Sequence, residues 1–266
     1  MCDLLTISSR TAYKASYSLP DFAVCGERNC DGWGVGYFRE DGTAQVRKSS
    51  HAAYDPEHDT LDAALVKLAK ETRSQYFLGH VRFTSCGETC DQNCHPFKLS
   101  FLGRDWLFAH NGTCREIVKY ESPNDSVPDA TNDSARVFEY LRDRILKRYA
   151  PSGPGARSLF GALTDATLEL INEYDSPDGR GDNFNYVLCD GQLLFVFMHH
   201  RPFYMLHRAK ERADALILTT CGGEDGGGLT DAEAWHELND RDRSYGTLML
   251  IVHDTVVNTT QITRGE

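Results

Sequence analysis

The order of β-rich and helical segments is the feature that most limits how this chain can fold. Short runs rich in β-branched and aromatic residues come first, helical periodicity collects in the middle of the chain, and β-rich runs return near the end. This grouping favours an α+β fold of packed layers over an alternating parallel sheet. We expect strands at residues 33–38, 76–83, 106–110, 184–189, 193–198, 215–220 and 248–252, and amphipathic helices around residues 61–68, 137–145 and 159–171.

A turn dipeptide supports an antiparallel arrangement of the strands. Asp190-Gly191 separates two of the expected strands, and both of its residues tolerate the positive φ that a tight hairpin turn requires. Adjacent strands are therefore expected to be mostly antiparallel. The chain has no internal repeat, low-complexity tract or long Pro/Gly linker, so we expect residues 1–266 to form a single domain.

The charge balance excludes several classes of function. The chain has 28 Lys and Arg against 39 Asp and Glu, a formal net charge of −11, which repels nucleic-acid phosphates and anionic membranes. Its apolar runs are far shorter than the roughly 20 residues of a membrane helix. The first residues lack the pattern of a secretory signal, so we expect a cytoplasmic protein whose nine cysteines are free thiols.

Cys2 is the first candidate for chemistry. Removal of Met1 before this small side chain would leave a thiol and a free α-amine on one residue. Their ordinary pKa values are about 8.5 for the thiol and about 7.7–8 for the amine. The amine can therefore accept the thiol proton near neutral pH while the sulfur attacks a carbonyl. The alternative is that Cys2 is simply a small residue at the start of a strand.

Two further segments end in residues suited to substrate binding. Arg82 follows an expected strand and precedes a polar turn closed by Gly87, where its guanidinium could bind a carboxylate through two hydrogen bonds. Asn111-Gly112 ends another apolar run and could point an amide and a backbone N–H at one oxygen, as an oxyanion hole does. A surface arginine and an Asn-Gly hairpin turn are the structural alternatives.

Together these motifs resemble the class II glutamine amidotransferases, which use an N-terminal nucleophile. The likeness is to the small branch that carries the amidotransferase domain alone. It extends over nearly the whole chain and is weaker beyond residue 132. The motifs that carry it are Met1-Cys2, Asp31-Gly32-Trp33-Gly34-Val35-Gly36, Gly79-His80-Val81-Arg82, Asn93-x-His95-Pro96-Phe97 and His110-Asn111-Gly112.

The resemblance implies a four-layer αββα sandwich of the Ntn-hydrolase type and a role for each matching residue. Cys2 would form a γ-glutamyl thioester, with its own amine as the base. Asn111 and Gly112 would stabilise the oxyanion. Arg82 would bind the α-carboxylate of the substrate, and Asp133 its α-ammonium. No cofactor and no metal are implied. The remaining residues that would line the substrate pocket are Phe83, Thr84, Ser85 and Gly87.

The chain departs from the family pattern near the pocket. The family often has an acidic residue two places after the position of Asp133, where this chain has Ala135. The segment after Arg82 commonly reads Ala-Thr, where this chain has Thr84-Ser85. These departures weaken the assignment of Asp133 more than that of Cys2.

A metal or redox interpretation competes for the cysteine-rich loop. Cys86, Cys90, Cys94 and His95 lie within ten positions and include soft metal ligands. Their spacing is permissible for structural zinc without being distinctive. The amidotransferase resemblance already accounts for His95.

Three functions follow for the chain as a whole. The first is hydrolysis of the γ-amide of glutamine, with ammonia released for a separate synthase or acceptor-activating protein. The second is hydrolysis of another γ-glutamyl amide or peptide, with no ammonia transfer. The third, from another class, is a metal- or redox-sensing binding protein that uses the Cys86–Cys94 loop. Neither a nucleic acid nor a membrane is expected as a partner.

Overall fold

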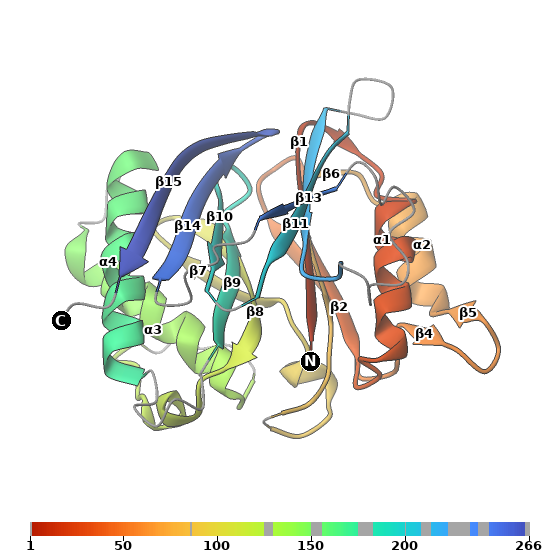
Figure 1. Cartoon of the computed structure of the whole chain (residues 1–266), viewed down its shortest axis with the longest axis horizontal. Coiled ribbons are helices and arrows are strands. Elements are labelled where there is room, and N and C mark those ends of the chain that lie inside the picture. Colours follow the sequence, from red (N-terminus) through yellow and green to blue (C-terminus); the bar gives the residue numbers. More distant parts are fainter. Residues whose placement is uncertain are drawn as a thin grey trace.

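Two antiparallel sheets pack face to face in this chain, and helices cover both outer faces (Figure 1). The computed structural model describes residues 2–85, 87–124, 130–149, 156–174, 183–199, 201–208, 214–222, 235–238 and 245–263. The four layers confirm the α+β, αββα architecture of the Ntn-hydrolase type. None of the helices within these ranges combines the length and the apolar character needed to cross a membrane.

The first sheet has seven strands and carries the start of the chain near its centre. Helices α1 (Ser18–Ala23) and α2 (Ala63–Glu71) lie against its outer face (Figure 1). The two-stranded ribbon of β4 (Tyr54–Asp55) and β5 (Thr60–Leu61) and the 3-10 turn η1 (Val24–Glu27) lie beside them. The strand order is β13 (His236–Leu238), β11 (Phe203–Arg208), β12 (Ala215–Thr219), β1 (Asp3–Tyr13), β6 (Ser74–Val81), β2 (Trp33–Phe38) and β3 (Ala44–Ser49).

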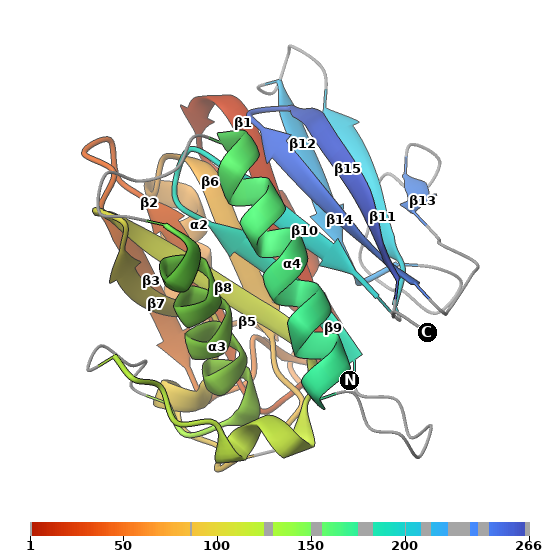
Figure 2. The same ribbon diagram turned by 90° about the vertical axis from the view of Figure 1, so that its left-hand side faces the viewer.

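The second sheet has six strands, and α3 (Asp133–Arg148) and α4 (Ala156–Tyr174) cross its outer face (Figure 2). The 3-10 turns η2 (Asp91–Asn93) and η3 (Arg115–Lys119) flank its central hairpin. The Asp190-Gly191 turn joins two neighbouring antiparallel strands, as predicted, and Gly191 has a φ of 82°. The strand order is β15 (Thr255–Thr263), β14 (Tyr245–Val252), β10 (Leu194–Met198), β9 (Asn183–Cys189), β8 (Arg104–Thr113) and β7 (Phe97–Phe101).

Strand β8 shows how alternation along a strand builds the layers. Trp106 and Phe108 pack in the cluster beneath α3 and α4, whereas Leu107 and Ala109 pack in the cluster between the two sheets. Successive side chains of a strand point to opposite faces. Asn111 follows the parity of Leu107 and Ala109, so it points toward the first sheet.

Two glycines of β2 allow the chain to cross between the sheets at close range. A Cβ on Gly34 would lie 1.8 Å from the carbonyl oxygen of His95, and a Cβ on Gly36 would lie 2.7 Å from Pro96. The segment that leads into β7 therefore rests directly on the backbone of β2. This contact confirms that the Asp-Gly-Trp-Gly motif serves close backbone packing.

One sequence expectation about the cysteines is wrong. Cys25, in η1, and Cys221, just after β12, form a disulfide although 196 residues separate them in the sequence. Their Cα atoms lie 6.6 Å apart, within the range that a disulfide spans. The prediction of free thiols failed because the fold, which composition does not reveal, brings the two residues together. Six other cysteines of the described residues are free: Cys2, Cys30, Cys90, Cys94, Cys114 and Cys189.

The close contact at Gly34 gives a prediction about stability. Gly34→Ala should lower the free energy of unfolding by at least about 2 kcal/mol, because the added methyl meets backbone atoms that cannot rotate away. Urea denaturation followed by circular dichroism measures the change.

A second glycine supplies the matched control. Gly161 is exposed in α4, and nothing lies within 4 Å of a Cβ built on it. Gly161→Ala should therefore leave stability unchanged or raise it by about 0.5–1 kcal/mol, since alanine favours a helix interior. Equal losses in the two variants would contradict the packing that we describe.

Candidate active site

The sulfur of Cys2 lies against the backbone of the loop that follows β6. Asp3 pairs with Val81 in the sheet, so Cys2 lies beside Arg82. The N–H of Phe83 donates to the Cys2 sulfur at 3.2 Å, and the thiol donates to the Phe83 carbonyl at the same distance. Burial raises the pKa of the Cys2 thiol, and the bond from Phe83 acts in the opposite direction. The sulfur is thus held in one place as a neutral thiol.

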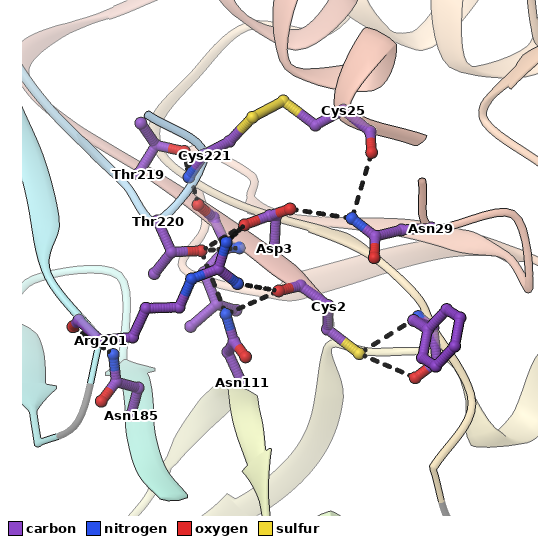
Figure 3. A network of polar contacts seen from close by, with 12 residues as sticks. Cys2, Asp3, Cys25, Asn29, Asn111, Asn185, Arg201, Thr219, Thr220 and Cys221 are labelled. Carbon is purple, nitrogen blue, oxygen red and sulfur yellow. Dashed lines mark hydrogen bonds and ion pairs between the residues drawn. A yellow bond between two sulfur atoms is a disulfide. The ribbon is translucent and has the colours of Figure 1, made fainter. Parts of the chain in front are cut away.

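The carbonyl oxygen of Cys2 receives two donors from distant parts of the chain (Figure 3). Asn111 Nδ2, from β8, donates to it at 2.7 Å, and a terminal guanidinium nitrogen of Arg201 also donates at 2.7 Å. The second hydrogen of Asn111 Nδ2 points to Thr220 Oγ1 at 3.2 Å. Asn111 therefore lies at the nucleophile candidate, as predicted, and there it fixes the backbone of Cys2.

Asp3 forms the centre of a buried polar cluster directly behind Cys2 (Figure 3). Its carboxylate pairs with Arg201 at 2.9 Å and accepts hydrogen bonds from Asn29 at 2.8 Å and Thr220 at 3.0 Å. Burial raises the pKa of Asp3, and the guanidinium of Arg201 and the two hydrogen bonds oppose that rise. The disulfide flanks this cluster, since Asn29 also donates to the Cys25 carbonyl and Cys221 follows Thr220.

Arg82 begins a loop that connects three predicted pocket residues. Its side chain is 3% exposed and donates to the carbonyl oxygen of Glu88 at 3.1 Å. Thr84 N–H donates to Asp31 at 2.7 Å. The Ser85 hydroxyl lies 3.2 Å from that of Thr113, which follows Gly112 on β8. The loop therefore spans the space between Cys2 and the end of β8.

Asn93 links this loop to the start of α3. Its side chain donates to the Glu88 carbonyl, the same acceptor that Arg82 uses, and accepts from Thr131 N–H at 3.0 Å. Gly87 fits closely beside this amide with a φ of 79°. The motif that contains Asn93 therefore joins the Arg82 loop to the helix that carries Asp133.

Asp133 lies at the first turn of α3 and is 4% exposed. Its carboxylate accepts from Cys114 N–H at 2.7 Å and from Ser134 N–H at 2.9 Å. His110 points to the same side and contacts the Ser134 hydroxyl at 2.9 Å. Asp133 therefore binds backbone groups of its own surroundings in this structure, and its role toward a substrate stays a prediction.

The cysteine-rich loop shows a different environment from that of a metal site. Cys86 lies outside the described residues. Cys94 is buried, and burial raises the pKa of its thiol to about 11, so it carries a proton at neutral pH. Its thiol donates to the carbonyls of Ser49 and Cys90. Within the described ranges, no three Cys, His, Asp or Glu side chains are arranged to hold a metal ion.

Sequence reasoning missed Arg201, Asp3, Asn29 and Thr220, although all four surround Cys2. None of them belongs to a motif that stands out in the sequence. The one available signal was Asn185, in the segment Phe184-Asn185-Tyr186 that resembles the family weakly. Its side chain donates to the backbone carbonyl of Arg201 at 2.7 Å.

Comparison with known proteins agrees with this geometry. Residues 1–216 match the family described as glutamine amidotransferases class-II. An uncharacterized protein of Methanocaldococcus jannaschii is 30% identical over 214 residues, which is 80% of this chain and 55% of that protein. The chain thus spans little more than half the length of that relative.

Two further comparisons concern a hydrolase and a solved structure. The γ-glutamyl-hercynylcysteine sulfoxide hydrolase of Mycolicibacterium smegmatis is 25% identical over 217 residues, covering 82% of this chain and 80% of the hydrolase. A crystal structure of a predicted glutamine amidotransferase from Pseudomonas aeruginosa superposes with a TM-score of 0.62 at 21% identity, covering 97% of this chain and all of the other. That structural likeness supports the fold.

The family match over most of the chain agrees with the αββα layers. This chain therefore belongs to the class II glutamine amidotransferases, enzymes of the N-terminal-nucleophile type.

Proposed function

We propose that the chain, once Met1 has been removed, hydrolyses the γ-amide of glutamine through a thioester on Cys2. The observation that carries the proposal is the placement of Cys2, whose sulfur and carbonyl are both held by hydrogen bonds at the junction of the two sheets. A nucleophile with so few orientations loses little entropy when it reacts.

The chemistry follows the arrangement of donors and acceptors. The α-amine of Cys2 takes the thiol proton as sulfur bonds to the γ-carbonyl carbon of the substrate. The same proton is then given to the amide nitrogen, which leaves as ammonia. Water hydrolyses the thioester and releases glutamate. Delivery of the ammonia to a separate synthase or acceptor-activating protein belongs to the same proposal.

Asn111 and Gly112 are proposed to stabilise the oxyanion of the tetrahedral intermediate. Both hydrogens of Asn111 Nδ2 have acceptors in the free protein, the longer bond being that to Thr220. The amide can turn one hydrogen toward an oxyanion by giving up that longer bond. Charge-assisted hydrogen bonds are stronger than neutral ones, so the exchange is favourable once the intermediate forms.

A second candidate is hydrolysis of a larger γ-glutamyl compound. The hydrolase relative from Mycolicibacterium smegmatis supports it, and so does the side chain of Phe83, which is 47% exposed next to the residue that holds the Cys2 sulfur. An exposed aromatic ring at the edge of a site can bind an apolar leaving group. Ammonia has no such surface to offer.

Covalent labelling tests the nucleophile. An electrophilic glutamine analogue should add one equivalent to the protein that lacks Met1, and Cys2→Ala and Cys2→Ser should gain none, because each lacks the thiol. Intact-mass spectrometry reports both the loss of Met1 and the adduct.

Cys30 supplies the control for labelling, since it is an exposed free thiol. Cys30→Ala should be labelled at the rate of the parent protein. Labelling that persists in Cys2→Ala would remove Cys2 from the mechanism.

A double-substitution cycle tests whether Arg82 binds the α-carboxylate. The parent protein should hydrolyse glutamine with a kcat/KM about 30–100 times that for glutamine α-amide, because a charge-assisted bond contributes roughly 2–3 kcal/mol. In Arg82→Gln this preference should fall below about threefold, since the neutral side chain no longer distinguishes the two substrates. Arg82→Lys should give an intermediate preference. An undiminished preference in Arg82→Gln would assign the carboxylate to another residue.

A comparison of substrates separates the two candidate functions. If glutamine is the substrate, Phe83→Ala should change its kcat/KM by less than about twofold, because ammonia buries no apolar surface. If a γ-glutamyl compound with an apolar leaving group is the substrate, its kcat/KM should exceed that of glutamine and fall about tenfold in Phe83→Ala, the effect of roughly 1.4 kcal/mol of lost burial. Steady-state kinetics with both substrates decides between them.

A further inference from the structure

Arg201 combines three properties that the proposed mechanism has not used. It contacts the carbonyl of Cys2, it pairs with the carboxylate of Asp3, and its side chain remains 28% exposed. We propose that Arg201 and Asp3 form a positioning pair that orients the amino-terminal base of Cys2 and sets its proton affinity. The inference rests on the proposed function, because it concerns the same base.

The backbone around Arg201 is fixed before its side chain reaches the site. Asn185, which is fully buried in β9, donates from Nδ2 to the Arg201 carbonyl at 2.7 Å and accepts from His199 N–H at 2.8 Å. One amide thus holds both ends of a three-residue segment (Figure 3 shows the bond to Arg201). A guanidinium that starts from a fixed backbone loses less entropy when it binds.

The guanidinium holds two consecutive residues with different atoms. One terminal nitrogen donates to the Cys2 carbonyl at 2.7 Å, and the other pairs with Asp3 Oδ1 at 2.9 Å. Together with Asn111, this contact restricts rotation about the Cα–C bond of Cys2. The direction of the α-amine relative to the sulfur is restricted in turn, and proton transfer between them depends on that direction.

The same pair places opposite charges next to the base. A cation near an amine favours its neutral form, and an anion favours its ammonium form. Arg82 and Asp31, from β6 and the loop before β2, are further charged side chains near Cys2 and stay unchanged in the test below. His80 on β6 is neutral, since burial lowers its pKa to about 3. The charges that can be altered separately are therefore those of Arg201 and Asp3.

Opposite shifts are expected when each member of the pair is neutralised. Arg201→Gln removes the cation and leaves Asp3, which keeps its bonds from Asn29 and Thr220 and stays ionised above neutral pH. The amine then holds its proton more tightly. Asp3→Asn removes the anion and leaves the cation, so the amine gives up its proton more readily. Both statements also hold if the thiol is the group that titrates, because its deprotonation adds negative charge.

The experiment measures the rate at which an electrophilic glutamine analogue alkylates Cys2 from pH 5.5 to 9.5. Intact-mass spectrometry of the protein that lacks Met1 follows the reaction. The acidic limb should move up by about one pH unit in Arg201→Gln and down in Asp3→Asn. Arg201→Lys keeps the charge but loses the two-point contact, so it should lower the rate and leave the limb at the pH of the parent.

Arg104→Gln is the matched control. Arg104 pairs at 2.6 Å with Asp190, whose side chain is fully buried, and it lies at the other end of β8 from Asn111. Loss of that pair tests the effect of removing any arginine from a buried carboxylate, and it should leave the limb unmoved.

The outcomes separate this inference from the proposed function. Absence of alkylation at Cys2 in the parent protein at every pH would overturn the thioester mechanism itself. Alkylation of the parent with limbs that coincide in Arg201→Gln and Asp3→Asn, or that move in the same direction, would overturn only the positioning pair. If Arg201→Gln does not fold, the direction of the shift in Asp3→Asn decides.

Discussion

The two hydrogen bonds to the carbonyl oxygen of Cys2 join the parts of this molecule that must meet for any chemistry to occur. Asn111 comes from the six-stranded sheet, and Arg201 from the segment that leads into β11 of the seven-stranded sheet. The start of β1 is therefore attached to both sheets. Because β1 lies between β12 and β6, its register also fixes the loop after Arg82, whose Phe83 backbone holds the sulfur.

The glycines of β2 support this junction from the inside of the sandwich. Gly34 and Gly36 let the chain around His95 pass directly over the strand, and the His95 ring then stacks on that of His80 at 4.2 Å between ring centres. Burial lowers the pKa of both histidines, so the pair adds no charge beside Arg82. The packing thus places a positive guanidinium in the site without a second cation behind it.

Much of the fold and the centre of the site could be predicted from the sequence, because they depend on local patterns. The periodicity around residues 137–145 lies within α3, and the run at 33–38 is β2. Cys2 and Asn111 stand in motifs whose order along the chain is informative, and the structure brings them together. The surroundings of Cys2 could not be predicted, since Arg201 and Thr220 are ordinary residues whose importance arises from contacts more than 190 positions away. The Asp133 carboxylate was assigned to a substrate ammonium, but in the structure it accepts from backbone N–H groups, which local sequence does not reveal.

The bridge between Cys25 and Cys221 also acts on the denatured ensemble. It closes a loop of 196 residues, and the chain-entropy relation for so long a loop corresponds to about 5 kcal/mol of conformational freedom withheld from the unfolded chain. The two ends of that loop flank the Asp3 cluster. A covalent link therefore keeps both walls behind the nucleophile near each other even when the rest of the chain has come apart, and refolding begins from a circle rather than from a line.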